Sequence, residues 1–214
     1  MPGAALALYA IYLGLTFGLR TLIQVRRTGS TGFHGIGGRP GSVEWLAGVG
    51  FALGVALGAA APLLDLLGVV EPFAALDVTG LHVAGLALAT AGIVATFAAQ
   101  VAMGTSWRVG VDPEEKTSLV TGGPFAVVRN PIFAAMLPAA VGLALLVPSW
   151  VALAGLAGLA LAIELQVRCV EEPHLRRVHG AAYAVYASRV GRFFPGLGRL
   201  ADAENAAGSA FHSR

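Results

Sequence analysis

The sequence predicts an all-α, polytopic integral membrane protein with about five transmembrane helices and an amphipathic helix at its C-terminal, cytoplasmic end. Three observations support this class. Of the 214 residues, 56% are hydrophobic and only 12% are charged, whereas soluble domains carry about 25% charged residues. The apolar residues gather in five stretches of membrane-spanning length. When these stretches are threaded through a bilayer, every basic residue falls on one side of it.

Each of the five apolar stretches is close to the roughly 20 residues that a helix needs to cross a hydrocarbon core of about 30 Å. The first stretch has no basic region before it and no A-x-A-like cleavage site, so we interpret it as a retained span and not as a signal peptide. The expected spans are Ala4–Val25, Val43–Val70, Val78–Gly104, Pro131–Val147 and Trp150–Val170.

The distribution of the fourteen Lys and Arg residues predicts the orientation. They lie at the end of the first span or between the first and second spans, between the third and fourth spans, and at or after the end of the fifth. The two connections on the other side contain none. The positive-inside rule therefore predicts an external N-terminus and a cytoplasmic C-terminus, and we expect the plasma membrane as the location.

The second span carries three glycines at intervals of four residues, Gly50, Gly54 and Gly58. Small residues at this spacing let helices approach closely. We expect them to pack helices within one molecule, with a homodimer as the alternative.

The polar segments define three expected parts of the chain. Residues 1–104 form a three-helix membrane half, residues 105–198 form a second half with two spans, a loop and a tail helix, and residues 199–214 form a disordered tail. The tail 174–192 has helical spacing, which predicts an amphipathic helix at the membrane surface. Its expected apolar face is made by Leu175, Val178, Ala182, Val185 and Tyr186.

The triplet Arg129-Asn130-Pro131 marks the expected start of the fourth span, because Asn is favoured as an N-cap and Pro at the first helical position. A helix N-terminus offers free N–H groups to an anion, and Arg129 adds a formal charge. The structural alternative is a plain helix start with a snorkelling arginine.

The loop before this triplet reads Thr117-Ser118-Leu119-Val120-Thr121-Gly122-Gly123-Pro124-Phe125. Apolar side chains alternate here with glycines, whose backbone adopts many conformations. Such a loop can wrap a flat ring and bond its polar edge through backbone groups, although many unrelated loops contain Gly-Gly-Pro.

Two adjacent carboxylates, Glu171 and Glu172, stand at the cytoplasmic end of the fifth span. They are either solvated or available for ribose hydroxyls or a cation. Arg168 lies three and four residues before them and so shares their helical side, while Glu164 is expected to pair with Arg168 at i,i+4. The histidines show no metal-ligand spacing, and the sequence contains no nucleotide P-loop and no zinc signature.

Together these segments resemble the isoprenylcysteine carboxyl methyltransferase family, which is related to the phospholipid methyltransferases. One matching region runs from Leu119 through Gly123-Pro124-Phe125 to Arg129-Asn130-Pro131-Ile132-Phe133. The other contains Glu171-Glu172-Pro173-His174-Leu175 and then Gly180, Tyr183, Tyr186, Arg189-Val190, Arg192 and Pro195.

The resemblance implies S-adenosyl-L-methionine as cofactor, bound on the cytoplasmic side by the second half of the chain. It implies that Arg168 and Asn130 are catalytic, with Arg168 orienting the substrate. The residues that it implies for cofactor binding are Thr117, Ser118, Leu119, Val120, Phe125, Asn130, Pro131, Phe133, Glu171 and Tyr186. Asn130 occupies the position of a histidine in the family's motif, and Phe133 occupies the position of a tyrosine. These two differences bear on the identity of the substrate and on whether the protein is active.

The resemblance also implies methyl transfer to a lipophilic or lipidated acceptor that enters from the bilayer, with membrane lipids as the other partners and no nucleic acid. A carboxylate nucleophile is already ionised at neutral pH and needs no general base. An amine would need one, and no convincing base is present, which favours a carboxylate or an already deprotonated thiol. The alternatives are a lipid amine methyltransferase, a membrane reductase with a nicotinamide cofactor held by the Gly-rich loop 26–42, and a scaffold without catalysis.

Overall fold

The computed structural model describes residues 1–110 and 118–200, and these residues are mainly helical, with no β-strand. Two helices are continuous through a π-helical turn. α1 (Pro2–Leu13) passes through Gly14–Leu19 into α2 (Arg20–Thr28), and α6 (Trp150–Leu165) passes through Gln166–Glu171 into α7 (Glu172–Arg189). The other α-helices of the described part are α3 (Val43–Leu66), α4 (Thr79–Ala102) and α5 (Pro131–Leu146).

The expectation of about five membrane spans is confirmed. Four helices, Pro2–Thr28, Val43–Leu66, Thr79–Ala102 and Trp150–Arg189, are long and apolar enough to cross a membrane, and α5 is a shorter apolar helix of 16 residues. The helix Trp150–Arg189 has 40 residues, and its part before a break at Gly180 is roughly 45 Å long at 1.5 Å per residue, longer than a hydrocarbon core of about 30 Å. Its part after Val170 therefore projects beyond the predicted fifth span.

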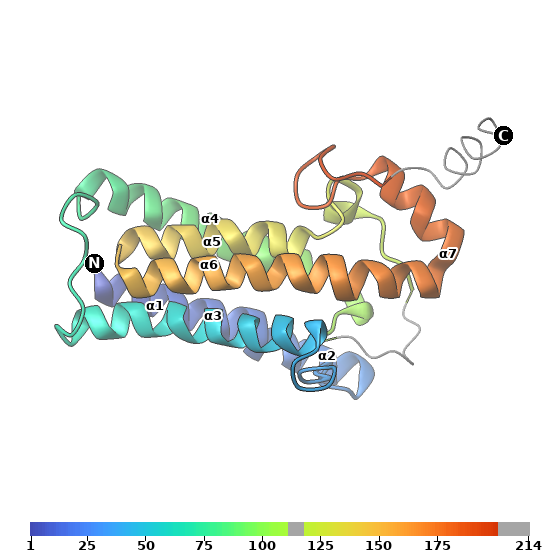
Figure 1. Ribbon diagram of the computed structural model, residues 1–214, viewed down its shortest axis with the longest axis horizontal. Coiled ribbons are helices and arrows are strands. Elements are labelled where there is room, and N and C mark those ends of the chain that lie inside the picture. Colours follow the sequence, from blue (N-terminus) through green and yellow to red (C-terminus); the bar gives the residue numbers. More distant parts are fainter. Residues whose placement is uncertain (111–117, 201–214) are drawn as a thin grey trace.

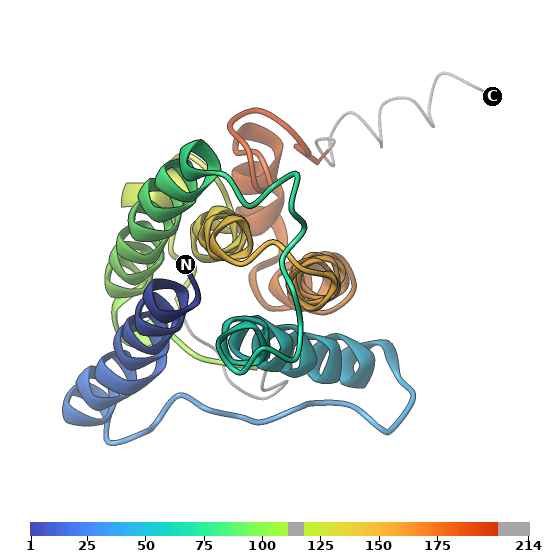
Figure 2. The same ribbon diagram turned by 90° about the vertical axis from the view of Figure 1, so that its left-hand side faces the viewer.

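The bundle is built from two closely packed helix pairs and one further helix (Figures 1 and 2). α3 packs along α6, α4 packs along α5, and α1 lies against both pairs. Small residues make the α4–α5 contact close. A Cβ atom added at Gly92 would lie 2.6 Å from the backbone nitrogen of Ala139, and one added at Gly142 would lie 2.3 Å from that of Ala89.

The glycines of α3 pack within the chain, as expected. A Cβ atom at Gly54 would lie 2.9 Å from Leu159 of α6, and one at Gly58 would lie 2.9 Å from the Tyr9 hydroxyl of α1. Gly50 faces Ala162 of α6 at 3.3 Å. The molecule's own helices cover this glycine face, so the homodimer stays a prediction that these glycines do not support.

The segments predicted to be cytoplasmic meet at one end of the bundle. The N-terminus lies at the opposite end, together with the α3–α4 and α5–α6 connections (Figure 1). The charged and polar segments that flank the spans are therefore neighbours in space. The identity of the membrane that contains the bundle stays a prediction, and so does the side of the membrane that the polar end faces.

The tail differs from the expected separate amphipathic helix. α7 continues directly from α6 and turns sharply at Gly180, which has φ +51° and ψ −124°. A positive φ of this kind favours glycine. The break shifts the helical register, so the buried residues after it are Tyr183 and Ala187, while Ala182 and Val185 are exposed. That Ala182, Val185 and Tyr186 face the membrane surface or the site stays a prediction.

Candidate active site

The polar end of the bundle is organised by backbone pairing between the start of α5 and the segment after α7. Val128 and Gly191 form an isolated parallel bridge. The backbone N–H of Arg129 donates to the Gly191 carbonyl oxygen at 2.8 Å, and that of Asn130 donates to the Arg192 carbonyl oxygen at 3.1 Å. Two segments about 60 residues apart in sequence are thereby held side by side.

Arg129 is buried at the centre of this end, with 6% of its surface exposed. Its Nη2 donates to Glu172 Oε1 at 2.7 Å and to the Gly198 carbonyl oxygen at 2.9 Å. Its Nη1 donates to the carbonyl oxygens of Ala187, at 3.0 Å, and of Val190. Arg129 is thus not a snorkelling residue, because it is buried and its charge is compensated by Glu172. That the start of α5 binds an anionic ligand stays a prediction.

Glu172 completes this structural cluster. Arg192 donates from Nε to Glu172 Oε1 and from Nη2 to Oε2, each at 2.8 Å. Burial by itself would raise the pKa of the Glu172 carboxyl, but the hydrogen bonds from Arg192 and Arg129 hold it below its usual value. Glu172 is therefore an ionised carboxylate enclosed by two guanidinium groups, and its role is structural.

Asn130 marks the beginning of α5, as predicted, and Pro131 is the first helical residue. The Asn130 side chain forms no capping hydrogen bond. Its Nδ2 donates instead to the Arg192 carbonyl oxygen at 3.2 Å, which both fixes the amide and strengthens the pairing of the two segments.

Phe125 and Tyr186, both predicted to bind the cofactor, are brought together. The Tyr186 hydroxyl donates to the Phe125 carbonyl oxygen at 2.6 Å. Phe125 itself is buried in the short 3₁₀ turn Gly123–Ala126. This bond ties the tail helix to the Gly-Gly-Pro loop, so the two motifs form one unit.

Glu171 lies next to the structural cluster but outside it. Its Oε1 accepts a hydrogen bond from Gln166 Nε2 at 3.4 Å. Burial raises the pKa of the Glu171 carboxyl to about 7, although the Gln166 bond and the charge of Arg108 act in the opposite direction. Of the two adjacent glutamates, this one has the weaker compensation among the described residues, and its binding of a cofactor stays a prediction.

Arg168 precedes these carboxylates within a π-helical turn, where the α-helical spacing used for the prediction does not hold. The π-helical turn Gln166–Glu171 inserts extra residues per turn and rotates the register. The Arg168 Nε instead contacts Glu164 Oε2, with the two side chains 57% and 42% exposed. The expected Glu164–Arg168 pair is confirmed, while the catalytic role of Arg168 stays a prediction.

The remaining predicted residues fall into three groups. Ser118 is exposed, with its hydroxyl 3.3 Å from that of Ser106, and Leu119 and Val120 are half-buried. Phe133 packs edge-on against Phe51 of α3, with ring centroids 6.5 Å apart. Thr117 lies outside the described residues.

Sequence reasoning missed Arg20, whose charge it used only for orientation. Arg20 is 1% exposed, and its guanidinium carbon lies 4.6 Å from the centre of the Trp107 ring. Its Nε donates to the Gln100 carbonyl oxygen at 3.2 Å, its Nη1 donates to Gln24 Oε1 at 3.1 Å, and its Nη2 donates to the Gly104 carbonyl oxygen. An ionisable residue inside an apolar span was the available signal.

Residues 81–182 match a family model described as phospholipid methyltransferase, a range that includes every predicted site residue except Tyr186. No significant match to a curated protein was found.

Among solved structures, the chain is similar to the eukaryotic intramembrane Ras methyltransferase ICMT, isoprenylcysteine carboxyl methyltransferase. The TM-score is 0.51 at 18% identity, and the match covers 92% of this chain and 78% of that one. The chain is therefore a helical membrane protein with this fold, and its predicted resemblance to the isoprenylcysteine carboxyl and phospholipid methyltransferases is confirmed.

Proposed function

We propose that the chain is an integral membrane methyltransferase that uses S-adenosyl-L-methionine and methylates a lipophilic or lipidated acceptor, at a carboxylate. The family-model match supports methyl transfer in general, and the fold is one in which such chemistry occurs at a membrane. The cofactor is what the resemblance to these methyltransferases implies, and the carboxylate acceptor is our inference from the sequence, in which no convincing general base for an amine was found.

The contrast between Glu171 and Glu172 carries this proposal. Two arginines neutralise Glu172, whereas burial raises the pKa of Glu171 to about 7, and no described residue forms a salt bridge with Glu171. A perturbed carboxyl group of this kind is a candidate for a functional site. A ligand that brings hydroxyl donors or a positive charge to Glu171 would supply the missing compensation, and S-adenosyl-L-methionine has both.

S-adenosyl-L-methionine would supply an electrophilic methyl group on a sulfonium centre. Glu171 would accept hydrogen bonds from the ligand. Leu119, Val120 and Phe125 would contact its apolar ring faces. Tyr186, held by the Phe125 carbonyl oxygen, would keep the tail helix over the loop.

The acceptor would meet this site from the bilayer, since α5 and α6 lead from the membrane-spanning part directly to it. An acceptor carboxylate is ionised near neutral pH, so no residue has to remove a proton. Asn130 fits this scheme because it forms a neutral hydrogen bond and cannot act as a base. The catalytic contribution would then come from positioning and from exclusion of water.

The test is calorimetric titration of the purified protein with S-adenosylhomocysteine. Glu171→Gln removes the charge at the proposed site, and Glu164→Gln is the matched control, the same change at an exposed carboxylate 7 residues earlier in the same continuous helix. We expect saturable binding by the wild type and by Glu164→Gln, with loss of binding in Glu171→Gln.

Titrations of the same purified protein distinguish the methyltransferase from the reductase and scaffold alternatives. A folded wild-type protein that binds NADPH and not S-adenosylhomocysteine would indicate the reductase, and one that binds neither would indicate a scaffold. With a free isoprenoid acid as acceptor, Arg168→Ala should lower turnover and leave the affinity for S-adenosylhomocysteine unchanged. Unchanged turnover would contradict the predicted catalytic role of Arg168.

A further inference from the structure

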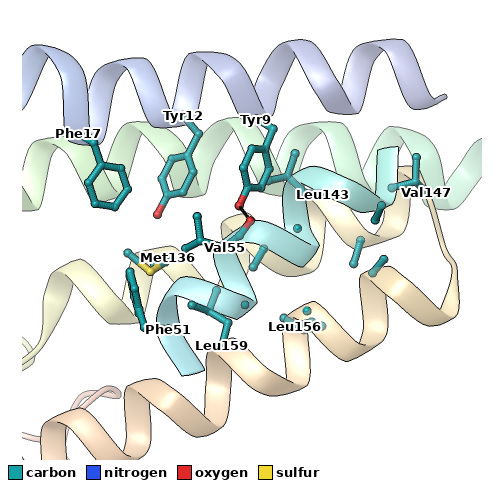
Figure 3. Close-up of a pocket in the computed structure, with 17 residues that line it drawn as sticks. Tyr9, Tyr12, Phe17, Phe51, Val55, Met136, Leu143, Val147, Leu156 and Leu159 are labelled. Atoms are coloured by element: carbon teal, nitrogen blue, oxygen red, sulfur yellow. Dashed lines mark hydrogen bonds between the residues drawn. The ribbon is translucent and has the colours of Figure 1, made fainter. Parts of the chain in front are cut away.

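The cavity inside the bundle, between α1, α3, α5 and α6, is too small for a lipid. It is lined mainly by aromatic and aliphatic side chains, among them Tyr12, Met136 and Leu159 (Figure 3). Its volume is about 40 Å³, which accommodates a few water molecules and is far below the roughly 300–1,000 Å³ of pockets that hold small molecules. The apolar surface that is open to lipid therefore lies on the outside of the molecule.

An exposed apolar tip, which we define as residues 193–198, follows α7. After the turn at Gly180, the last part of α7 runs back toward the bundle, and the tip lies beside the beginning of α5 (Figure 1). Phe194 and Leu197 are each 66% exposed, and the residues between them are exposed as well. The tip thus presents aromatic and aliphatic surface at the end of the bundle where the charged residues gather.

Hydrogen bonds hold the tip in one conformation. The backbone N–H of Arg192 donates to the Leu197 carbonyl oxygen at 2.7 Å, and that of Leu197 donates to the Phe194 carbonyl oxygen at 3.1 Å. Gly196 and Gly198 have φ angles of +76° and +72°, which favour glycine. The buried arginine at the centre of the polar end also donates to the Gly198 carbonyl oxygen, at 2.9 Å. A preformed tip loses little conformational entropy when it binds a surface.

The depth of the tip in the membrane follows from its attachment to α5. Gly191, just before the tip, forms the parallel bridge with Val128, which lies three residues before Pro131, the first helical residue of α5. Phe193 packs against the same core cluster as the first turn of α5. Because the apolar span begins at Pro131, the tip lies level with the boundary between the hydrocarbon core and the headgroups.

The charges beside the tip suit this boundary. Arg189 precedes the tip and Arg199 follows it; both are exposed, and no acidic residue lies between them. Arginine interacts favourably with anionic headgroups, while aromatic and aliphatic side chains gain by leaving water for the acyl region. The bilayer therefore complements the tip in both charge and polarity.

We propose that the tip inserts into the bilayer interface at the polar end of the bundle, with Phe194 and Leu197 among the acyl chains and Arg189 and Arg199 at the headgroups. The partner of this apolar surface is the lipid bilayer that also surrounds the spans, and not a second protein. Insertion fixes the last part of α7 relative to the membrane, in addition to its attachment to α5. It depends on neither the cofactor nor methyl transfer.

The test is site-directed spin labelling of the full chain in lipid nanodiscs, with the exposed Cys169 replaced by Ser. Single labels are attached at Phe194→Cys and at Leu197→Cys. Leu161→Cys, at a side chain that is 63% exposed in α6, is the control within the membrane, and Arg176→Cys, exposed in α7 beyond the predicted fifth span, is the control in water. Power saturation compares the accessibility of each label to oxygen, which concentrates in hydrocarbon, with its accessibility to a water-soluble nickel chelate.

We expect the labels at positions 194 and 197 to be several-fold more accessible to oxygen than to the nickel chelate, as at position 161, and the label at position 176 to show the reverse. The side chains replaced at 194 and 197 are largely exposed, so both variants should keep the melting temperature of the Cys169→Ser parent.

Two results would overturn the proposal. Labels at 194 and 197 that are more accessible to the nickel chelate, as at position 176, would show that the tip lies in water. Low accessibility to both reagents, together with the spectrum of an immobilised label, would show that protein and not lipid covers the tip. Each result can be obtained whether or not the protein transfers methyl groups.

Discussion

Replacing Glu172 by Gln should destabilise the protein strongly, although the change preserves the shape of the side chain. The Glu172 side chain is 6% exposed and accepts three hydrogen bonds of 2.7–2.8 Å from Arg129 and Arg192. The side chains of these two arginines are 2% and 12% exposed, respectively. Removing the anion leaves two guanidinium groups without compensation at a buried site. Breaking a buried ion pair in this way costs about 3–5 kcal/mol.

The assay is thermal unfolding of the purified protein in detergent, followed by circular dichroism. For a chain of this size the loss corresponds to a melting temperature lower by about 10 °C. Glu164→Gln is the matched control, because its pair with Arg168 is 42% and 57% exposed. An exposed i,i+4 pair contributes about 0.3–0.5 kcal/mol, so the control should melt close to the wild type.

The same reasoning gives a pH dependence. The pKa of Glu172 is held below its ordinary value of 4.5, so its stabilisation is fully present above that pH and is lost as the pH falls below it. The wild type should therefore lose this stability on acidification, and Glu172→Gln should not. Equal melting temperatures for Glu172→Gln and Glu164→Gln, or equal acid sensitivity of Glu172→Gln and wild type, would refute the structural role of Glu172.

Three further results follow from the same structure. Tyr186→Phe removes the donor to the Phe125 carbonyl oxygen, so it should lower stability by about 1 kcal/mol and weaken the binding of S-adenosylhomocysteine. An unchanged affinity in calorimetric titration would show that the tail helix does not contribute to the binding site. Affinity for S-adenosylhomocysteine, whose amino group is cationic, should rise as the pH increases through about 7 and Glu171 ionises, and a flat profile in the wild type would contradict this. Arg20→Lys should lower the melting temperature and change the tryptophan fluorescence, because an ammonium group cannot reproduce both the fork of hydrogen bonds and the contact with Trp107; a wild-type spectrum would argue against that contact.

The sequence was sufficient for features that depend on local chemistry. The span count followed from apolar lengths, the start of α5 followed from Asn130-Pro131, and the pair between Glu164 and Arg168 followed from helical spacing. Each of these depends on residues within a few positions of one another. The motifs around Pro131 and Glu171 were also sufficient for the resemblance that the comparisons confirmed.

The failures have a common physical origin in backbone irregularities and in distant contacts. The π-helical turn at Gln166–Glu171 and the break at Gly180 each shift the register by an amount that regular 3.6-residue spacing does not anticipate. For this reason the tail buries Tyr183 and Ala187, which regular spacing did not single out.

The sequence by itself determined that this protein is a helical membrane bundle with its polar segments gathered on one side, because hydrocarbon thickness and charge placement act on each segment separately. Only the tertiary structure decided which of the two glutamates is held by arginines. Glu172 is enclosed by arginines 43 residues before it and 20 residues after it in the chain, and Glu171 is not. Likewise, the cavity beside Tyr12 is made by four helices from both halves of the chain. Ion pairs and cavities of this kind form between segments that are distant in sequence and come into contact only when the bundle has folded.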